Sequence, residues 1–443
     1  MPERVAWPQV QSPVSLLAGL PDDAAATLLG LPDHMRSVSP GVAGEDQPRL
    51  YCDPRLARSR SAYCGFLREM QTRGMLTYRR TSEVGASNVG IFFVGKKDSR
   101  QRIIFDTRAA NGQFGPPPPT ILSSASALGS LETNGQEVFS ATGDLECAFY
   151  HLLLPESLQS SFRLPCIRAG ALGMSHLQSQ RVSGDCWLTP CVRVLPMGWS
   201  WAPWCCQQYL EEALRRAALP GSQIMHDGEA PVVLRSDKDL ALGAYLDNFL
   251  VVGYKADAVA AASDAIAAVL RQQGMVVHEV TAASTDTTFV GVQFGDGGRR
   301  LAVKPERVWR LRAAIDEVLR RGRLSPRGLE VLLGHITWAM LLRREALALL
   351  GSVYAFARQV SALPLRLWAS VRKELRWVAS LLPLFATDTS IGWCQKITAS
   401  DASLFGAGVC SARFPAHSVS SMGRTAENGD TKSPPPSPPA AML

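Results

Sequence analysis

The stretch AYLDNFLVVG, residues 244–253, places a two-residue turn between two apolar runs. Tyr245 and Leu246 precede the turn and Phe249 to Val252 follow it, which predicts two antiparallel strands with a tight connection. Such a turn projects its side chains from the tip of the hairpin. The stretch therefore predicts that Asp247 is displayed at the end of an apolar hairpin, beside Asn248.

Three further segments share this mixture of apolar strands and chemically active side chains. They are GKKDSRQRIIFDTRAAN at 95–111, TGDLECAFYHLLLP at 142–155 and LPMGWSWAPWCCQ at 195–207. The first includes the tip of a predicted hairpin, whose strands are expected at 89–94 and 102–105. In the second, Asp144 follows a candidate strand at 138–143. Asp144 and Asp247 lie 103 positions apart, so only tertiary structure can bring them together.

Taken together and in this order, the four segments resemble the reverse transcriptases of retroelements. The resemblance runs from about Leu50 to Phe294, and more loosely to Cys410. It implies an α+β fold, a right-hand polymerase with fingers, palm and thumb around an antiparallel palm sheet. It also implies RNA-directed DNA polymerase activity, in which two metal ions assist nucleotidyl transfer to a primer 3′-hydroxyl.

By this resemblance Asp144 and Asp247 are the metal ligands, for Mg²⁺ or alternatively Mn²⁺. Asn248 stands where the family usually has a second Asp, and because Asn carries no charge we expect weakened activity. Taken singly, Asp144 could be a helix N-cap and Asp247 an ordinary turn residue. The stretch 274–281 has no lysine to serve as the general acid, which leaves His278 as the nearest candidate. A lone histidine is more often structural.

The resemblance also assigns residues to the incoming nucleotide: Lys96, Lys97, Arg102, Phe149, Met197 and Gly198. The basic hairpin tip would hold the triphosphate, with the choice between the two lysines left open. Phe149 would pack under the sugar and exclude a 2′-hydroxyl, although a core aromatic is the alternative. Gly198 would allow the backbone to approach the ligand closely.

A third set would contact template and primer: Arg108, Asn111, Trp199, Arg307, Arg310, Arg320 and Arg321. Asp106, Arg108 and Asn111 match a scaffold motif of the family. Residues 299–327 hold ten Lys or Arg against three Asp or Glu, a net charge of +7 that equals the net charge of the whole chain. For Asp106, Arg108 and Asn111 the alternative is a surface charge cluster. For the arginines within 299–327 it is a solvated helix face, and for Trp199 it is simple packing.

The pattern along the chain predicts six regions. They are a poorly ordered N-terminal arm at 1–45, fingers at 46–137, a palm at 138–300 with a fingers insertion at about 156–195, a helical thumb or connection at 301–390, a strand segment at 391–412 and a disordered Pro-rich tail at 413–443.

The strand segment contains TASDAS at 398–403, followed by Gly406 and Gly408. It resembles the opening strand of a ribonuclease H domain, in which Asp401 would be a metal ligand. Such a domain needs further carboxylates, spread over many more residues than the 42 that follow Asp401 here. We therefore expect a truncated domain without ribonuclease H activity.

Composition limits the classes of protein that remain. The length of 443 residues suggests two to four domains, and a composition of 46% hydrophobic and 19% charged residues allows most of the chain to bury a core. The net charge of +7 favours an anionic partner. No apolar run predicts a membrane span or a secretory signal, and ten scattered cysteines predict neither a zinc site nor a disulfide framework. We expect an intracellular protein, nuclear or cytoplasmic, of undecided oligomeric state.

The expected partners are an RNA or DNA template with its primer and deoxynucleoside triphosphates. Two other function classes stay open. One is a catalytically dead, retroelement-derived nucleic-acid binder, which Asn248 favours. The other is an RNA-dependent RNA polymerase, which Phe149 opposes.

Overall fold

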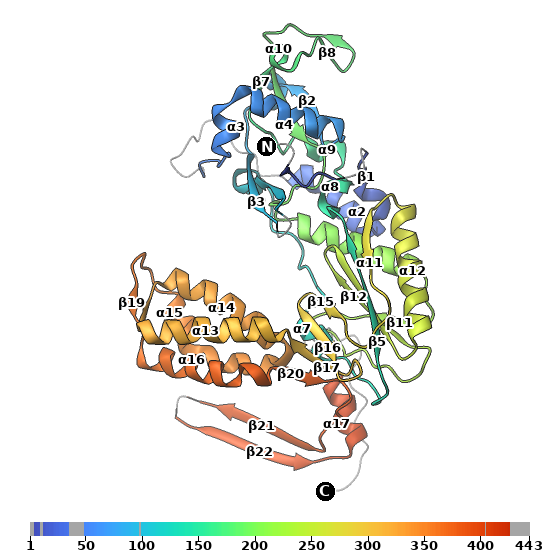
Figure 1. The fold of residues 1–443 in the computed structure, drawn as a ribbon, viewed down its shortest axis with the longest axis vertical. Helices are drawn as coiled ribbons and strands as arrows, with labels where there is room; N and C mark the ends of the chain where they lie inside the picture. Colours follow the sequence, from blue (N-terminus) through green and yellow to red (C-terminus); the bar gives the residue numbers. More distant parts are fainter. Residues whose placement is uncertain (1–3, 9–11, 35–47, 97–98, 404, 426–443) are drawn as a thin grey trace.

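The computed structural model describes residues 4–8, 12–34, 48–96, 99–403 and 405–425, and its α+β architecture is drawn in Figure 1. A central sheet lies between an upper region of short strands and helices and a lower helical region (Figure 1). Buried apolar side chains form one cluster around the upper region and central sheet, and a second under the helical region.

The central sheet has the strand order β11-β12-β13-β5-β14. β12 and β13 form the predicted hairpin, and β5 pairs with β13 on one side and β14 on the other, all antiparallel. Only the edge pairing of β11 with β12 is parallel. The bounds are β5 Phe139–Leu145, β11 Ser222–Ile224, β12 Leu240–Tyr245, β13 Asn248–Gly253 and β14 Val277–Val280.

Two long helices, α11 (Ala202–Arg216) and α12 (Ala256–Gln272), pack against this sheet and against each other. α12 buries Val259, Ile266 and Leu270, which recur at helical spacing, and leaves its charged residues exposed. The sequence predicted both helices, at 204–218 and 256–273, and both are confirmed to within two residues at each end.

The upper region contains the hairpin of β3 (Gly90–Gly95) and β4 (Gln101–Asp106) and a sheet of order β2-β10-β7. Helix α4 (Arg60–Thr72) buries Phe66, Leu67 and Met70, and its N-cap Ser59 accepts a hydrogen bond from the amide of Ala62. The other elements of this region are α3 Pro54–Arg58, β2 Leu76–Arg80, α5 Thr81–Val84, α6 Arg108–Asn111, α8 Ala148–His151, β6 Leu152–Leu153, α9 Glu156–Gln159, β7 Ile167–Arg168, α10 Ala169–Leu172, β8 His176–Leu177, β9 Gln180–Arg181 and β10 Trp187–Val192. Helix α7 (Ala125–Gly129) packs instead against the helical region, at residues 341–350.

The helical region is joined to the central sheet by a smaller sheet of order β15-β16-β17-β20. Its helix α14 (Pro326–Met340) begins after Ser325, whose Oγ accepts a hydrogen bond from the amide of Gly328 at 3.1 Å, and has Pro326 at its first position. The remaining elements are β15 Thr288–Phe289, β16 Val292–Gly295, β17 Arg300–Val303, α13 Pro305–Arg321, β18 Arg323–Leu324, the 3₁₀ segment Leu341–Leu350, α15 Gly351–Ala357, β19 Leu365–Arg366, α16 Ala369–Leu381, the 3₁₀ turn Leu382–Leu384 and β20 Ala386–Asp388.

The prediction of a poorly ordered arm at 1–45 is wrong for residues 12–34. These form β1 (Val14–Ser15), α1 (Leu16–Gly19), α2 (Asp22–Leu29) and a 3₁₀ turn at Leu31–His34. Leu16 and Leu28 are fully buried in the upper cluster, and β1 pairs with β6. Elements this short show no sustained periodicity, so their burial depends on distant residues that sequence inspection does not place.

The prediction of a disordered tail is likewise wrong for residues 413–425. α17 (Ala416–Gly423) buries Val419, and the guanidinium of Arg424 pairs with Glu132 at 2.6 Å. The predicted strand segment is a hairpin of β21 (Lys396–Ala402) and β22 (Ala407–Arg413). Residues 426–443 of the predicted tail lie outside the described residues. Within the described ranges, no helix combines the length and apolarity that crossing a bilayer requires.

Candidate active site

The tip of the β12–β13 hairpin is a strained turn. Tyr245 pairs with Asn248 across the hairpin, which leaves Leu246 and Asp247 as the two turn residues. The turn thus lies one residue earlier than the predicted Asp247 and Asn248, because Asn248 already belongs to β13. Leu246 has a φ of +58°, a left-handed conformation that costs a non-glycine residue roughly 1–2 kcal/mol. Its amide donates to Oε1 of Gln207 at 2.9 Å. A side chain from α11 thus holds the turn in a conformation that the turn would not favour alone.

Gln207 belongs to a buried polar network. Its Nε2 donates to Oε1 of Glu211 at 2.8 Å and to the carbonyl of Ala244 at 3.1 Å. Glu211, whose side chain is 4% exposed, also pairs with His226 at 3.2 Å and Arg215 at 2.8 Å. Burial raises the pKa of Glu211, but the hydrogen bonds and charges of these partners outweigh burial and leave it lowered. The network therefore fixes the hairpin tip from beneath.

Asp144 and Asp247 converge from different strands. Asp144 on β5 lies opposite Asn248 on β13, and the amide of Leu145 donates to the carbonyl of Asp247 at 2.8 Å. Gly143 makes this pairing possible, because a Cβ there would overlap the ring of Phe249. The structure thus brings together the two carboxylates that the sequence singled out.

The two carboxylates perturb each other. Burial, followed by the charge of Asp247, raises the pKa of Asp144 to about 6, while the positive charges of His278 and Lys96 oppose the rise. Burial also raises the pKa of Asp247, against hydrogen bonds from its own backbone and from Asn248. Paired acids with raised pKa values are typical of sites that a cation or a proton completes.

His278 occupies a β-bulge in β14. Val277 pairs with Leu145 and Glu279 with Asp144, and the register shifts between them. Bulges re-aim a side chain, and here His278 lines the same cavity as the two aspartates. The predicted proton donor is therefore within the site.

These residues surround a cavity of about 260 Å³. Its lining includes six of the predicted residues besides His278: Lys96, Arg102, Asp144, Phe149, Met197 and Asp247. Lys97, the alternative to Lys96, lies outside the described residues. Sequence reasoning missed Ala6 and Arg100, which also line the cavity. The sequence does mark Arg100, because it lies in the basic stretch at the tip of the predicted hairpin. No local pattern marks Ala6, because only long-range pairing with Gln101 brings its segment to the cavity.

Gly198 does not line the cavity. Its φ is +131°, and a Cβ there would overlap the carbonyl oxygen of Phe105. The amide of Phe105 in turn donates to the carbonyl of Met197 at 3.1 Å. Gly198 therefore allows the loop to pack against β4 rather than against a ligand, which corrects its predicted role.

Three predicted scaffold residues hold the protein's own chain. Arg108 binds Asp106 through two nitrogens, at 2.8 and 2.7 Å, and this pairing lowers the pKa of Asp106 to about 2. Asn111 donates to the carbonyl of Gly198 at 3.1 Å and accepts from the amide of Ser200 at 3.1 Å. The structure gives Arg108 and Asn111 these internal partners, and their contacts with nucleic acid stay predictions.

The assignment of Trp199 to template or primer is wrong in this structure. The side chain is 1% exposed and lies 5.2 Å from both Phe114 and Phe162, measured between ring centroids. Its Nε1 is buried without a hydrogen-bond partner among the described residues. Trp199 packs in an aromatic cluster, the alternative that the sequence left open.

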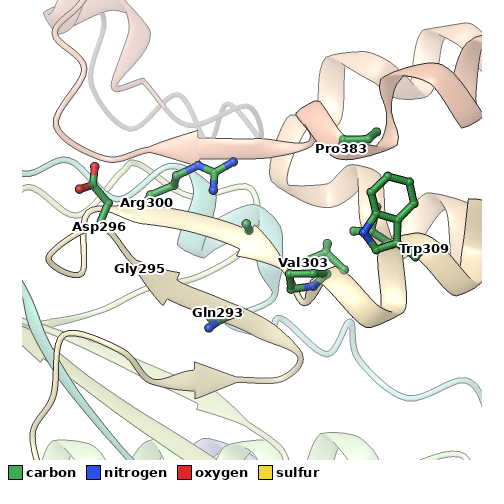
Figure 2. A pocket seen from close by; sticks show the side chains of 10 residues that line it. Gln293, Gly295, Asp296, Arg300, Val303, Trp309 and Pro383 are labelled. Atoms are coloured by element: carbon green, nitrogen blue, oxygen red, sulfur yellow. The ribbon is translucent and has the colours of Figure 1, made fainter.

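The predicted basic helix, α13, lies apart from this cavity. Arg307 stacks on Trp338 at 3.6 Å, and Arg320 and Arg321 pair with Glu317 at 2.7 and 2.6 Å. The start of α13 and strands β16 and β17 line a second cavity of about 360 Å³, where Trp309 faces Pro383 (Figure 2). Arg310 is exposed on the same helix. The structure does not bring these arginines to the aspartates.

The donor set fits a magnesium ion that substrate helps to bind. No group of three or more His, Cys, Asp or Glu side chains forms a metal cluster within the described residues. Asp144 and Asp247 are two carboxylates in a cavity that also holds Lys96 and Arg102. Magnesium commonly takes one or two carboxylates and completes its shell with substrate phosphates and water.

Comparison with known proteins gives fold-level similarity only. No protein-family model matches the chain. No curated protein sequence matches it either. Three solved structures of foamy viral protease-reverse transcriptase are similar over 90% of this chain, each at 14% sequence identity. They are the dRH form with double-stranded DNA, at a TM-score of 0.52; a complex with double-stranded DNA, at 0.51; and a complex with RNA/DNA hybrid, at 0.50.

The chain spans 64% of the first of these structures, 76% of the second and 51% of the third. The similarity shows a fold like that of the foamy viral protease-reverse transcriptase. The predicted α+β class is confirmed at that level.

Proposed function

We propose that this protein is an RNA-directed DNA polymerase of retroelement origin, which extends a primer 3′-hydroxyl with deoxynucleotides. One observation carries the proposal. Asp144 and Asp247 converge from separate strands in a cavity whose other walls carry Lys96, Arg102 and Phe149. Acidic, basic and aromatic side chains in one cavity suit the metal-binding, triphosphate and sugar parts of a nucleotide respectively.

The residues divide the reaction between them. Lys96 and Arg102 hold the triphosphate, and Phe149 packs beside the sugar, where a 2′-hydroxyl would collide with it. The primer 3′-oxygen attacks the α-phosphorus, the bond to pyrophosphate breaks, and the hydroxyl proton passes to solvent. His278 supplies a proton to the departing pyrophosphate. Asp144 and Asp247 would hold Mg²⁺, or Mn²⁺, and the bound metal would supply activation of the hydroxyl and neutralisation of phosphate charge.

The likeness in fold to the foamy viral structures supports the division into palm, fingers and thumb. By analogy, the central sheet is a palm, the β3–β4 hairpin belongs to fingers and α13–α16 to a thumb or connection. The basic helix α13 would then meet the template–primer duplex through Arg310, Arg320 and Arg321, although Glu317 already pairs two of them.

Primer extension on oligo-dT annealed to poly-rA tests the proposal, with magnesium and separately with manganese. The wild type should extend the primer, and Asp144→Ala and Asp247→Ala should abolish extension. Asp264→Ala, on the exposed face of α12, is the matched control and should retain it. No extension by folded wild type with either metal would refute the polymerase.

The second candidate is a catalytically inactive nucleic-acid binder. Asn248 favours it, because its carboxamide donates to Oδ1 of Asp247 at 2.7 Å and so occupies one of the few carboxylate oxygens in the site. Duplex binding that is unaffected by magnesium, without extension, would support it. Extension with ribonucleotides in preference to deoxynucleotides would instead indicate an RNA polymerase.

A further inference from the structure

The N-terminal segment, Arg4 to Pro8, lies beside β4, and Ala6 at its centre lines the candidate nucleotide cavity. Val5 pairs with Gln101 in a parallel bridge, and the amide of Ala6 donates to the carbonyl of Gln101 at 2.8 Å. Gln101 directly precedes Arg102 at the start of β4. The segment is thus attached to the strand that presents a proposed triphosphate ligand.

The same segment meets the opposite side of the cavity. The thiol of Cys147 donates to the carbonyl of Ala6 at 3.9 Å. Cys147 has a φ of +49° and directly precedes α8, the helix that carries Phe149. Ala6 itself lines the cavity and is 3% exposed. The backbone around Ala6 therefore links the triphosphate side of the cavity to its sugar side.

Trp7 anchors this segment to α4. Its ring lies 5.6 Å from the ring of Phe66, and the guanidinium carbon of Arg73 lies 4.9 Å above it. Val5, 6% exposed, joins the upper hydrophobic cluster. An aromatic anchor and a buried aliphatic one on either side of Ala6 leave its methyl group little freedom to withdraw.

We infer that the N-terminal segment is a wall of the nucleotide site, and that Ala6 is a positioning residue that sets the room available to the bound deoxynucleotide. The inference rests on the proposed polymerase function and adds a part of the nucleotide site to it. Alanine suits the position because Ala6 lines a cavity of only about 260 Å³ and is itself buried, so a larger residue there would compete with the nucleotide for room. A segment that merely stabilises the upper region would affect folding without affecting nucleotide affinity.

The first test enlarges the side chain. Ala6→Leu should raise the KM for dTTP on oligo-dT/poly-rA about tenfold, equivalent to roughly 1.4 kcal/mol of lost binding, with little change in the Kd for the duplex. Ala6→Ser should keep the wild-type KM, because its side chain is almost as small. Equal KM values for all three proteins would overturn the inference while the polymerase stands.

The second test releases the anchor. Trp7→Ala should raise the KM for dTTP, and Trp7→Phe should restore it because a phenyl ring can still stack on Phe66 and Arg73. Trp187→Ala is the matched control, since Arg168 lies 5.4 Å above that ring outside the cavity. A rise in KM from Trp187→Ala as large as that from Trp7→Ala would reduce the effect to general destabilisation and contradict the inference.

A readout independent of turnover separates this inference from the polymerase proposal. Hydrogen exchange is followed in wild type with oligo-dT/poly-rA carrying a dideoxy-terminated primer, with and without dTTP and magnesium. Slower exchange at residues 4–8 with dTTP supports the wall even if ordinary primers are not extended. No slowing there, with slowing near Lys96, overturns the wall alone. No slowing anywhere in the cavity overturns both proposals.

Discussion

Asn248 and Asp247 are joined side chain to side chain, with Nδ2 of the amide 2.7 Å from Oδ1 of the carboxylate. Asn248 also lies opposite Asp144 across the sheet. An amide at this position orients one acid and adds no charge beside the other. The site therefore tolerates its two half-buried carboxylates without a cation better than a site with three acids would.

Asn248→Asp should reverse this balance. We expect a lower melting temperature in EDTA, because a third carboxylate then lies beside two whose pKa values are already raised. We also expect a larger upward shift of the melting temperature on adding magnesium, since the extra charge attracts the cation. Thermal melts with EDTA, magnesium and manganese measure both effects. Asn248→Ala removes the hydrogen bond without adding charge, and an identical response from it would argue against the electrostatic account.

Gln207→Leu should displace the strained turn. The variant removes the acceptor for the Leu246 amide and leaves Glu211 without one of its donors. Because small misplacements of a reacting group can cost about a hundredfold in rate, we expect a kcat reduced by roughly ten- to a hundredfold with a smaller change in KM. Steady-state primer extension gives both constants. Gln223→Leu, on the edge strand β11, is the matched control and should keep the wild-type kcat. An unchanged kcat in Gln207→Leu would show that the turn keeps its conformation without the hydrogen bond to Gln207.

The ion pair of Glu211 with His226 should stabilise the fold most within one pH range and less at both lower and higher pH. The hydrogen bond to Glu211 raises the pKa of His226 above 6.5, so its contribution is complete below 6.5 and lost as pH rises through the folded value. The pKa of Glu211 is lowered below 4.5, so its contribution is complete above 4.5 and lost as pH falls through the folded value.

Melting temperature against pH should therefore show the largest benefit of this pair between about pH 4.5 and 6.5. Glu211→Gln and His226→Gln should each flatten that maximum relative to wild type. A wild-type profile that is superimposable on both variants would show that the pair contributes no pH-dependent stability.

Phe149→Ala should relax the choice of sugar. Removal of the ring opens space beside the expected 2′ position, and we expect ribonucleotide incorporation relative to deoxynucleotide to rise at least about tenfold. Competition between UTP and dTTP on poly-rA measures the ratio. The dTTP reaction of the same variant is the internal control, and an unchanged ratio would assign Phe149 to the core alone.

Much of the site was predictable because its residues stand in local patterns. The hairpin around Asp247 follows from two apolar runs and a two-residue gap, although its turn lies one residue earlier than predicted, and α14 begins where Ser325 and Pro326 predict. The convergence of Asp144 with Asp247 was inferred only from the resemblance. The register of β5 against β13 in the structure places them together. Buried Trp199 shows the limit, since an aromatic side chain has the same pattern whether it stacks on a base or on Phe114.

The N-terminal residues were not predictable for a different reason. Ala6 and Val14 belong to segments that become ordered only against Gln101, Cys147 and Leu152. No local periodicity marks such pairings, because each involves one or two residues. Long-range β pairing of this kind is a property of the assembled tertiary structure.

This same arrangement imposes an order on folding. Val5 can pair only once Gln101 is in place, and Val14 only once Leu152, its partner in the parallel pair, is in place. Such contacts close loops of about a hundred residues or more, whose entropic cost makes them late events. Val5 and Val14 precede their partners in the chain and are therefore among the last of these residues to dock, and the cavity around Ala6 is completed only after the central sheet has begun to form.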